Sequence, residues 1–74
     1  MIRYKDIDSD SGVQAYEIDS DSITVQFKGG GLYYFTYKSA GRDHVERMKQ
    51  LAEAGDGLNA FINTTVKKGY EWKR

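Results

Sequence analysis

Two stretches in the middle of the chain alternate between apolar and polar positions. In the first, residues 22–28, Ile23, Val25 and Phe27 alternate with threonine, glutamine and lysine. In the second, residues 32–38, aromatic side chains fall on every other position. A repeat of two is typical of a β-strand with one buried face. Three glycines join the two stretches, and glycine permits the positive φ angles of tight turns, so we predict a β-hairpin.

The chain before and after this hairpin has weaker strand patterns. Residues 13–18 are predicted to form another strand, which ends in a turn at Asp19-Ser20-Asp21. Residues 1–5 and 70–74 are expected to be short extra strands at the two ends. Strands that follow one another closely in sequence pair antiparallel, so we expect a small antiparallel sheet of three to four strands.

The spacing of apolar residues in the second half of the chain changes to three and four positions. This spacing is typical of a helix with one buried side, and it predicts helices over residues 42–54 and 58–68. Asp56 or Asn59 is expected to cap the start of the second helix, and Gly69 is expected to follow its end.

Strands therefore precede helices along the chain. This order predicts an α+β fold in which two helices pack on one face of the sheet. At 74 residues, the chain is expected to form a single domain, residues 1–74, with a small core to which aromatic side chains contribute much of the buried area. The side chains predicted to be buried together are Phe27, Phe35, Met48, Phe61 and Ile62.

The composition excludes several kinds of active site. The chain has no cysteine, so it has no disulfide, no thiolate metal site and no thiol nucleophile. Its single histidine, His44, cannot form a multi-histidine metal site and is expected to lie at the rim of the core. The sequence pattern contains no recognisable pairing of a nucleophile with a base. We therefore expect no catalytic residue, no metal and no cofactor, and a chain that is not an enzyme.

The sequence contains no stretch suited to crossing a membrane. Its uncharged runs are far shorter than the ~20 residues that span a bilayer, and no signal-peptide pattern opens the chain. We therefore expect no membrane contact and a cytoplasmic location.

Acidic residues near the start have the spacing of a calcium-binding loop. Asp6, Asp8, Asp10 and Glu17 fall on positions 1, 3, 5 and 12 of an EF-hand loop. Such a loop needs a glycine at position 6, where this chain has Ser11, and a helix at position 12, where Glu17 lies in a predicted strand. We therefore interpret the segment as a solvated acidic turn.

Charge is distributed unevenly along the chain, although the net charge is zero. Residues 1–27 carry a net charge of −4, and residues 28–74 carry +4. Such an asymmetry between the two halves is compatible with an electrostatic partner surface, with the second half facing an anionic partner. In a simpler interpretation, acidic residues gather in turns near the start and lysines near a helix end, and the two halves fold against each other so that their charges partly cancel.

Basic and aromatic residues are interleaved at the C-terminal end of the chain. Phosphates require positive charge and bases stack on exposed rings, so the pattern predicts contact with RNA or with an anionic protein surface. Tyr34 is expected to add a ring from the outer face of the sheet. The predicted contact residues at the C-terminal end are Lys67, Lys68, Tyr70, Trp72, Lys73 and Arg74. In a simpler interpretation, the lysines compensate the dipole of the helix end and the rings belong to an edge strand.

The order of the aromatic and glycine positions resembles the KTSC domain, a family named for its place at the C-terminus of some lysyl-tRNA synthetases. The resemblance runs from about Val13 to Trp72. It rests on Val13-x-x-Tyr16-Glu17, Ile23-x-Val25-x-Phe27, Gly30 ahead of Tyr33-x-Phe35, and Ile62-Asn63-x-x-Val66 ahead of Tyr70.

The KTSC resemblance implies a compact antiparallel sheet with helices. The family has no established activity, but its fusion to tRNA-charging enzymes implies a link to RNA. The resemblance assigns structural roles to Tyr16, Phe27, Tyr33 and Phe35. It also implies that Asn63 hydrogen-bonds a loop or a neighbouring backbone segment.

Two functions therefore remain open from the sequence. The first is a non-catalytic binding module for RNA or another anionic partner. The second is a protein-interaction module or a small homodimer with no role in nucleic-acid binding, because a thin core and a free sheet edge both favour a protein partner. Salt separates the two, since phosphate contacts weaken steeply with salt and an apolar interface does not.

Overall fold

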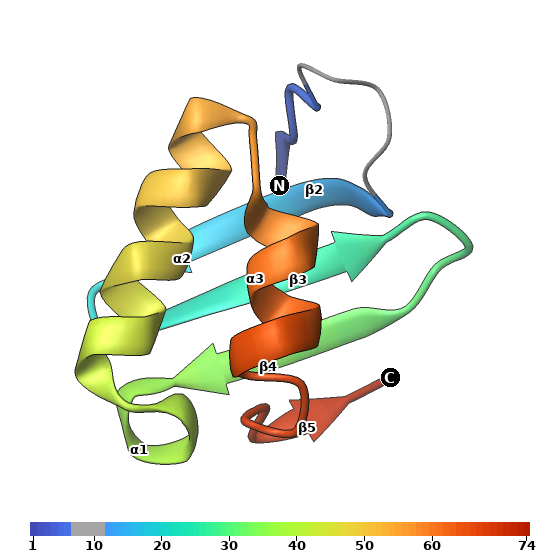
Figure 1. Cartoon of the computed structure of the whole chain (residues 1–74). Helices are drawn as coiled ribbons and strands as arrows, with labels where there is room; N and C mark the ends of the chain where they lie inside the picture. Colours follow the sequence, from blue (N-terminus) through green and yellow to red (C-terminus); the bar gives the residue numbers. More distant parts are fainter. Residues whose placement is uncertain (7–11) are drawn as a thin grey trace.

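The computed structural model describes residues 1–6 and 12–74. These residues form an antiparallel sheet of five strands in chain order: β1 (Ile2–Arg3), β2 (Val13–Asp19), β3 (Ser22–Phe27), β4 (Leu32–Thr36) and β5 (Trp72–Lys73). Three helices lie between β4 and β5 in the sequence: α1 (Tyr37–Ala40), α2 (Arg42–Ala54) and α3 (Leu58–Thr65). α2 and α3 cover one face of the sheet (Figure 1), and the predicted α+β class is confirmed.

Both ends of the described chain join the sheet, which gives one strand more than the predicted maximum of four. β1 pairs with β2, and β5 returns after the helices to pair with β4 (Figure 1). Each of these edge strands has two residues, and short edge strands offer little backbone for pairing with other chains.

The central hairpin of β3 and β4 forms as the alternation predicts. Ile23 pairs with Phe35 and Val25 pairs with Tyr33 across the two strands. The glycine turn between them is closed by hydrogen bonds between Phe27 and the glycines. Gly29 and Gly30 have φ angles of 96° and 99°, which side chains other than glycine rarely adopt, so the glycines are needed at this turn.

The predicted strand 32–38 ends two residues early, at Thr36. The Thr36 hydroxyl accepts the Ser39 amide, and the Ser39 hydroxyl accepts the Thr36 amide, each at 3.0 Å. This reciprocal capping starts α1, so Tyr37 and Lys38 are helical rather than extended. The Tyr37 ring still packs against the core, on the side that the alternation predicted.

α3 begins without either of its predicted caps. Its N-cap is Gly57, and neither Asp56 nor Asn59 bonds to the start of the helix. The buried hydroxyl of Tyr4, from the opposite end of the sequence, accepts the Leu58 amide at 3.2 Å instead. A tertiary contact thus satisfies a free N–H group that a local side chain was expected to satisfy.

α3 also ends three residues before its predicted boundary, at Thr65. Lys67 and Lys68 therefore lie in the segment that leads from α3 to β5, and not in the last helical turn. Gly69 does not mark the helix end. It lies against α1, where an added Cβ would come within 3.3 Å of the Ala40 Cβ.

The core lies between the sheet and the two long helices. Of the five side chains predicted to be buried together, Phe35, Met48 and Ile62 are buried. Phe27 and Phe61 are half-buried and pack against its margin, which corrects the prediction for these two residues. The other members of the buried cluster are Tyr4, Val13, Tyr16, Ile23, Val25, Val45, Ala52, Leu58 and Val66.

No helix in the described part of the chain is long and apolar enough to span a membrane.

Candidate functional site

A cavity of about 500 Å³ lies between α3, the turn that joins β3 to β4, and β5. Four lysines, two asparagines and three aromatic side chains line it, together with two glycines of the turn and Ile62. No carboxylate of the described residues lines it. We call this cavity the lysine pocket; its polar and aromatic side chains are Lys28, Lys67, Lys68, Lys73, Asn59, Asn63, Phe27, Tyr33 and Tyr70.

The four lysines of the pocket come from three separate parts of the sequence. Lys28 follows β3 at the glycine turn, Lys67 and Lys68 follow α3, and Lys73 lies in β5. β5 pairs with β4, and Lys73 lies directly opposite Tyr33. This pairing brings the C-terminal end of the chain next to the glycine turn. The sheet therefore joins charges that are some forty residues apart in sequence.

Aromatic side chains form the floor of the lysine pocket. The Tyr33 ring packs edge to face against Phe27, with 5.1 Å between centroids, and against Tyr70, with 5.3 Å. The ammonium group of Lys73 lies 5.9 Å from the Tyr33 centroid and 5.5 Å from the Tyr70 centroid. Cation–π attraction at such distances holds the charge of Lys73 above both rings.

Most polar groups of the lysine pocket have no partner among the described residues. Lys67, Lys68 and Lys73 form no ion pair there, and the side chains of Asn59 and Asn63 form no hydrogen bond. The role that the KTSC resemblance implied for Asn63, a hydrogen bond to a loop or backbone, is therefore wrong. These ammonium and amide groups are available to a ligand.

Lys28 differs from the other three lysines of the pocket. Its Nζ atom lies 3.1 Å from Oδ2 of Asp6, in an ion pair that joins the start of the chain to the glycine turn. The Lys28 side chain is 56% exposed and that of Asp6 is 14% exposed, so the ammonium group still faces solvent at the rim of the pocket.

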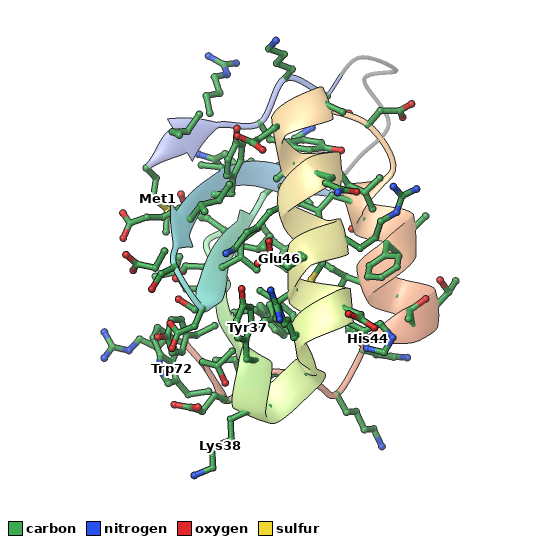
Figure 2. The ribbon with its side chains drawn as sticks, turned by 90° about the vertical axis from the view of Figure 1, so that its left-hand side faces the viewer. Met1, Tyr37, Lys38, His44, Glu46 and Trp72 are labelled. Atoms are coloured by element: carbon green, nitrogen blue, oxygen red, sulfur yellow. The ribbon has the colours of Figure 1, made fainter. Side chains whose placement is uncertain are left out.

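The contact residues predicted at the C-terminal end divide between two faces of the sheet. Lys73 faces the helices and the lysine pocket, whereas Trp72, its neighbour in β5, faces the side without helices. Figure 2 shows Trp72 on that side, away from His44 on the helical layer. These residues therefore do not form one continuous patch, because successive side chains of a strand point to opposite faces.

Three side chains form a second cluster on the outer face of the sheet. Tyr34 and Trp72 lie opposite one another on β4 and β5, and their rings stack with 5.1 Å between centroids and 21° between planes. The guanidinium carbon of Arg74 lies 4.8 Å from the centroid of the Trp72 ring. We call Tyr34, Trp72 and Arg74 the aromatic stack.

Sequence reasoning missed Lys28 and Asn59 as residues of the pocket. In the sequence, Asn59 has the position of a helix cap and Lys28 that of a strand end. One feature of the sequence could have identified Lys28: a basic strand at the C-terminal end of the chain can pair with the edge of the strand that follows the glycine turn. Pairing along that edge carries the lysines of the C-terminal segment to the glycine turn.

The calcium hypothesis falls largely on residues 7–11, so Asp8, Asp10 and Ser11 lie outside the described residues. Of its other members, Asp6 pairs with Lys28 and Glu17 is exposed in β2. Within the described ranges, no three histidine or acidic side chains are grouped as metal ligands.

A third polar cluster joins α1 and α2 to the turn between β2 and β3. The side chains of Tyr37 and Glu46 face one another (Figure 2), and the Tyr37 hydroxyl donates to Oε2 of Glu46 at 2.6 Å. Nζ of Lys49 lies 2.8 Å from the same oxygen. Lys49 also donates to the Ser20 carbonyl at 3.0 Å. The cluster therefore anchors this turn to the helices.

Hydrogen bonding in this cluster shifts two titrations. The bond to the Glu46 carboxylate raises the pKa of the Tyr37 hydroxyl, and partial burial acts in the same direction. The hydrogen bond from Lys49 lowers the pKa of Glu46, and the bond from Tyr37 adds to it. Both shifts keep the hydroxyl protonated and the carboxylate ionised, which is the state that holds the turn.

His44, the one histidine of the chain, is exposed on α2. Its Nδ1 atom lies 2.8 Å from the carbonyl oxygen of Ala40, and its ring lies against that of half-buried Phe61, with 6.0 Å between centroids. It therefore lies at the rim of the core, as predicted, and it is not among the side chains that line the lysine pocket.

Comparison of the chain with family models, with curated proteins and with solved structures finds no match. The case for a function therefore rests on the chemistry of the lysine pocket and of the aromatic stack.

Proposed function

We propose that this chain is a non-catalytic binding module whose lysine pocket holds the phosphates of single-stranded RNA. The observation that carries the proposal is the lining of the pocket. Four lysines surround a floor of aromatic side chains, and no carboxylate of the described residues lines the pocket. A ligand for such a site is anionic, and an RNA strand supplies a phosphate at every nucleotide.

The charge of the pocket is local, since the whole chain has a net charge of zero. Four ammonium groups around one cavity repel one another, and only Lys28 has a carboxylate partner among the described residues. Phosphates that enter the pocket would offset this repulsion and release counterions.

The remaining polar groups favour a nucleic acid over a simple inorganic anion. Asn59 and Asn63 can each donate and accept hydrogen bonds, as the edges of unstacked bases require. A cavity of about 500 Å³ exceeds the volume of a phosphate ion and falls within the range of about 300–1,000 Å³ found for organic ligands. Membership of the KTSC family, which we also propose, adds the association with tRNA-charging enzymes.

The chemistry of the lining supports binding rather than catalysis. The described residues of the pocket supply ammonium, amide and phenol groups, but no imidazole or carboxylate that could act as a base near neutral pH. We therefore assign no catalytic residue.

Fluorescence anisotropy tests this proposal. A labelled RNA of about 12 nucleotides is titrated with protein between about 50 and 200 mM salt. With four phosphate contacts, the slope of log K against log salt is expected to be about −3, and Lys67→Ala with Lys68→Ala should flatten it by about 1.4.

A matched control removes two positive charges elsewhere. Lys38→Ala with Arg47→Ala changes exposed residues of α1 and α2 that do not line the pocket. This variant should keep the wild-type slope. The proposal fails if wild type binds no RNA at low salt, or if both double variants lose affinity equally.

The alternative function, a protein-interaction module or homodimer, has one observation in its favour. Met1 and Ile2, at the β1 edge, are 57% and 58% exposed, which is unusual for large apolar side chains next to an edge strand. Sedimentation tests it: a dimer that persists at high salt and dissociates in Ile2→Lys would support this function.

A further inference from the structure

β5 lies between the lysine pocket and the aromatic stack. Lys73 contributes to the pocket on the helical side, and Trp72 and Arg74 contribute to the stack on the outer side. β5 is also the last strand of the sheet in the described chain, so no neighbouring strand separates the two clusters at this edge (Figure 1).

We propose that an RNA strand held in the lysine pocket continues over the edge of β5 and stacks a base on Trp72. This inference rests on the proposed function and extends it to a second site on the other face of the sheet. Positive charge accompanies the path, because Lys73 and Arg74 are adjacent in sequence and face opposite sides of the strand.

Trp72 is built to receive a planar group. It is 36% exposed, and Tyr34 stacks on its ring and fixes the orientation of the plane. Arg74 lies over the ring at 4.8 Å, and a guanidinium is a planar cation that stacks on rings much as a base does. Arg74 therefore occupies the position that we assign to the base.

A base is expected to stack on the Trp72 ring more strongly than Arg74 does, so that it replaces Arg74 there. An exposed cation–π contact corresponds to about 2- to 5-fold in an equilibrium constant, whereas stacking of one base on an aromatic ring corresponds to about 5- to 140-fold. A base can therefore displace Arg74 from the Trp72 ring. The released guanidinium is then free to bind the adjacent phosphate with two parallel hydrogen bonds.

The length of the RNA should decide whether Trp72 is reached. A strand must pass around the edge of β5 to reach from the lysine pocket to Trp72 on the other face. The smallest single-strand sites of compact domains cover about 4 nucleotides. A dinucleotide is expected to occupy the pocket alone. Longer strands are expected to add the stacking contact and its gain in affinity.

The experiment uses Trp72, the only tryptophan of the chain, as its own reporter. Unlabelled oligouridylates of about 2 to 12 nucleotides are titrated while tryptophan emission and backbone amide NMR shifts are recorded. The dinucleotide should shift amides of the lysine pocket and leave Trp72 emission unchanged. The longest strand should quench Trp72 emission and bind about 5- to 140-fold more tightly than Trp72→Leu binds it.

Two variants separate this inference from the proposed function. Trp72→Phe keeps an aromatic ring and should retain most of the increase in affinity with RNA length. Trp72→Leu should lose this increase but bind the dinucleotide as wild type does. If long RNA binds wild type with lysine-dependent affinity but leaves Trp72 emission unchanged, the inference fails and the proposed function stands. If no RNA of any length binds, both fail.

Discussion

Thr36 and Ser39 cap each other at the start of α1, and both also bond to the segment that leads into β5. The Thr36 hydroxyl accepts the Ser39 amide and donates to Oε1 of Glu71 at 3.0 Å. The Ser39 hydroxyl accepts the Thr36 amide and donates to the Gly69 carbonyl at 2.7 Å. One four-residue motif therefore ends β4, starts α1 and holds the segment that carries Tyr70 of the lysine pocket.

Removal of the Thr36 hydroxyl should destabilise the fold. Thr36→Val keeps the shape of the side chain but loses both of its hydrogen bonds at a buried position. We expect the free energy of unfolding to fall by about 1–2 kcal/mol, as for loss of a helix cap. Urea unfolding followed by circular dichroism measures the change. Thr36→Ser, which keeps the hydroxyl, is the control; equal stability of the two variants would refute the role of the hydroxyl.

Phe35 and Phe61 should differ in their contribution to stability. Phe35 is completely buried between the sheet and the helices, whereas Phe61 is half-buried beside His44. Phe35→Ala is expected to cost about 3–5 kcal/mol, because it leaves a cavity in the core. Phe61→Ala should cost about 1–2 kcal/mol, in proportion to the smaller apolar area that it buries. Equal losses in urea unfolding would show that Phe61 belongs to the core.

The sheet core was predictable because its signal is local. Ile23, Val25 and Phe35 lie on the buried side of a two-residue repeat, and one hairpin turn fixes their register. The cap of α3 was not predictable in this way, since Tyr4 reaches Leu58 across more than fifty residues of sequence. A local pattern cannot encode that contact.

The candidate site was predictable in composition but not in arrangement. The alternation of β5 implies that Trp72 and Lys73 point to opposite faces, but the pairing with β4 decides which of them faces the helices. The same pairing carries the C-terminal lysines to Lys28. Both depend on a contact between distant segments, so the sequence alone did not separate the lysine pocket from the aromatic stack.

The Glu46 carboxylate should make stability depend on pH in the acidic range. Its pKa is lowered from the ordinary value of 4.5, so the ionised form is favoured in the folded state. The resulting stabilisation is present above the pKa of the unfolded chain and is lost as the pH falls through the lower folded pKa. The difference in urea midpoint between wild type and Glu46→Gln should therefore shrink below about pH 4.5. A constant difference down to acidic pH would contradict this role.

The ion pair between Asp6 and Lys28 should weaken RNA binding at the rim of the lysine pocket. The Asp6 carboxylate lies 3.1 Å from the Lys28 ammonium group, and a phosphate must compete with it for that group. Because Lys28 is largely exposed, the pair is worth no more than about 1 kcal/mol. Asp6→Asn should therefore tighten RNA binding by about 2- to 5-fold at low salt, and the gain should fade as salt screens the charges.

Three further variants decide whether this gain comes from the contact or from net charge. Asp19→Asn removes the same charge from the exposed last residue of β2, which pairs with Ser22 at the end of β3 far from Lys28, so it should leave RNA affinity unchanged. Lys28→Ala should weaken RNA binding by itself. Combined with Lys28→Ala, Asp6→Asn should no longer change RNA affinity, because the Asp6 carboxylate then has no ammonium group for which it competes with the phosphate. Anisotropy titrations at low salt measure wild type and all four variants. If Asp19→Asn tightens binding as much as Asp6→Asn does, only net charge matters and Lys28 does not contact phosphate.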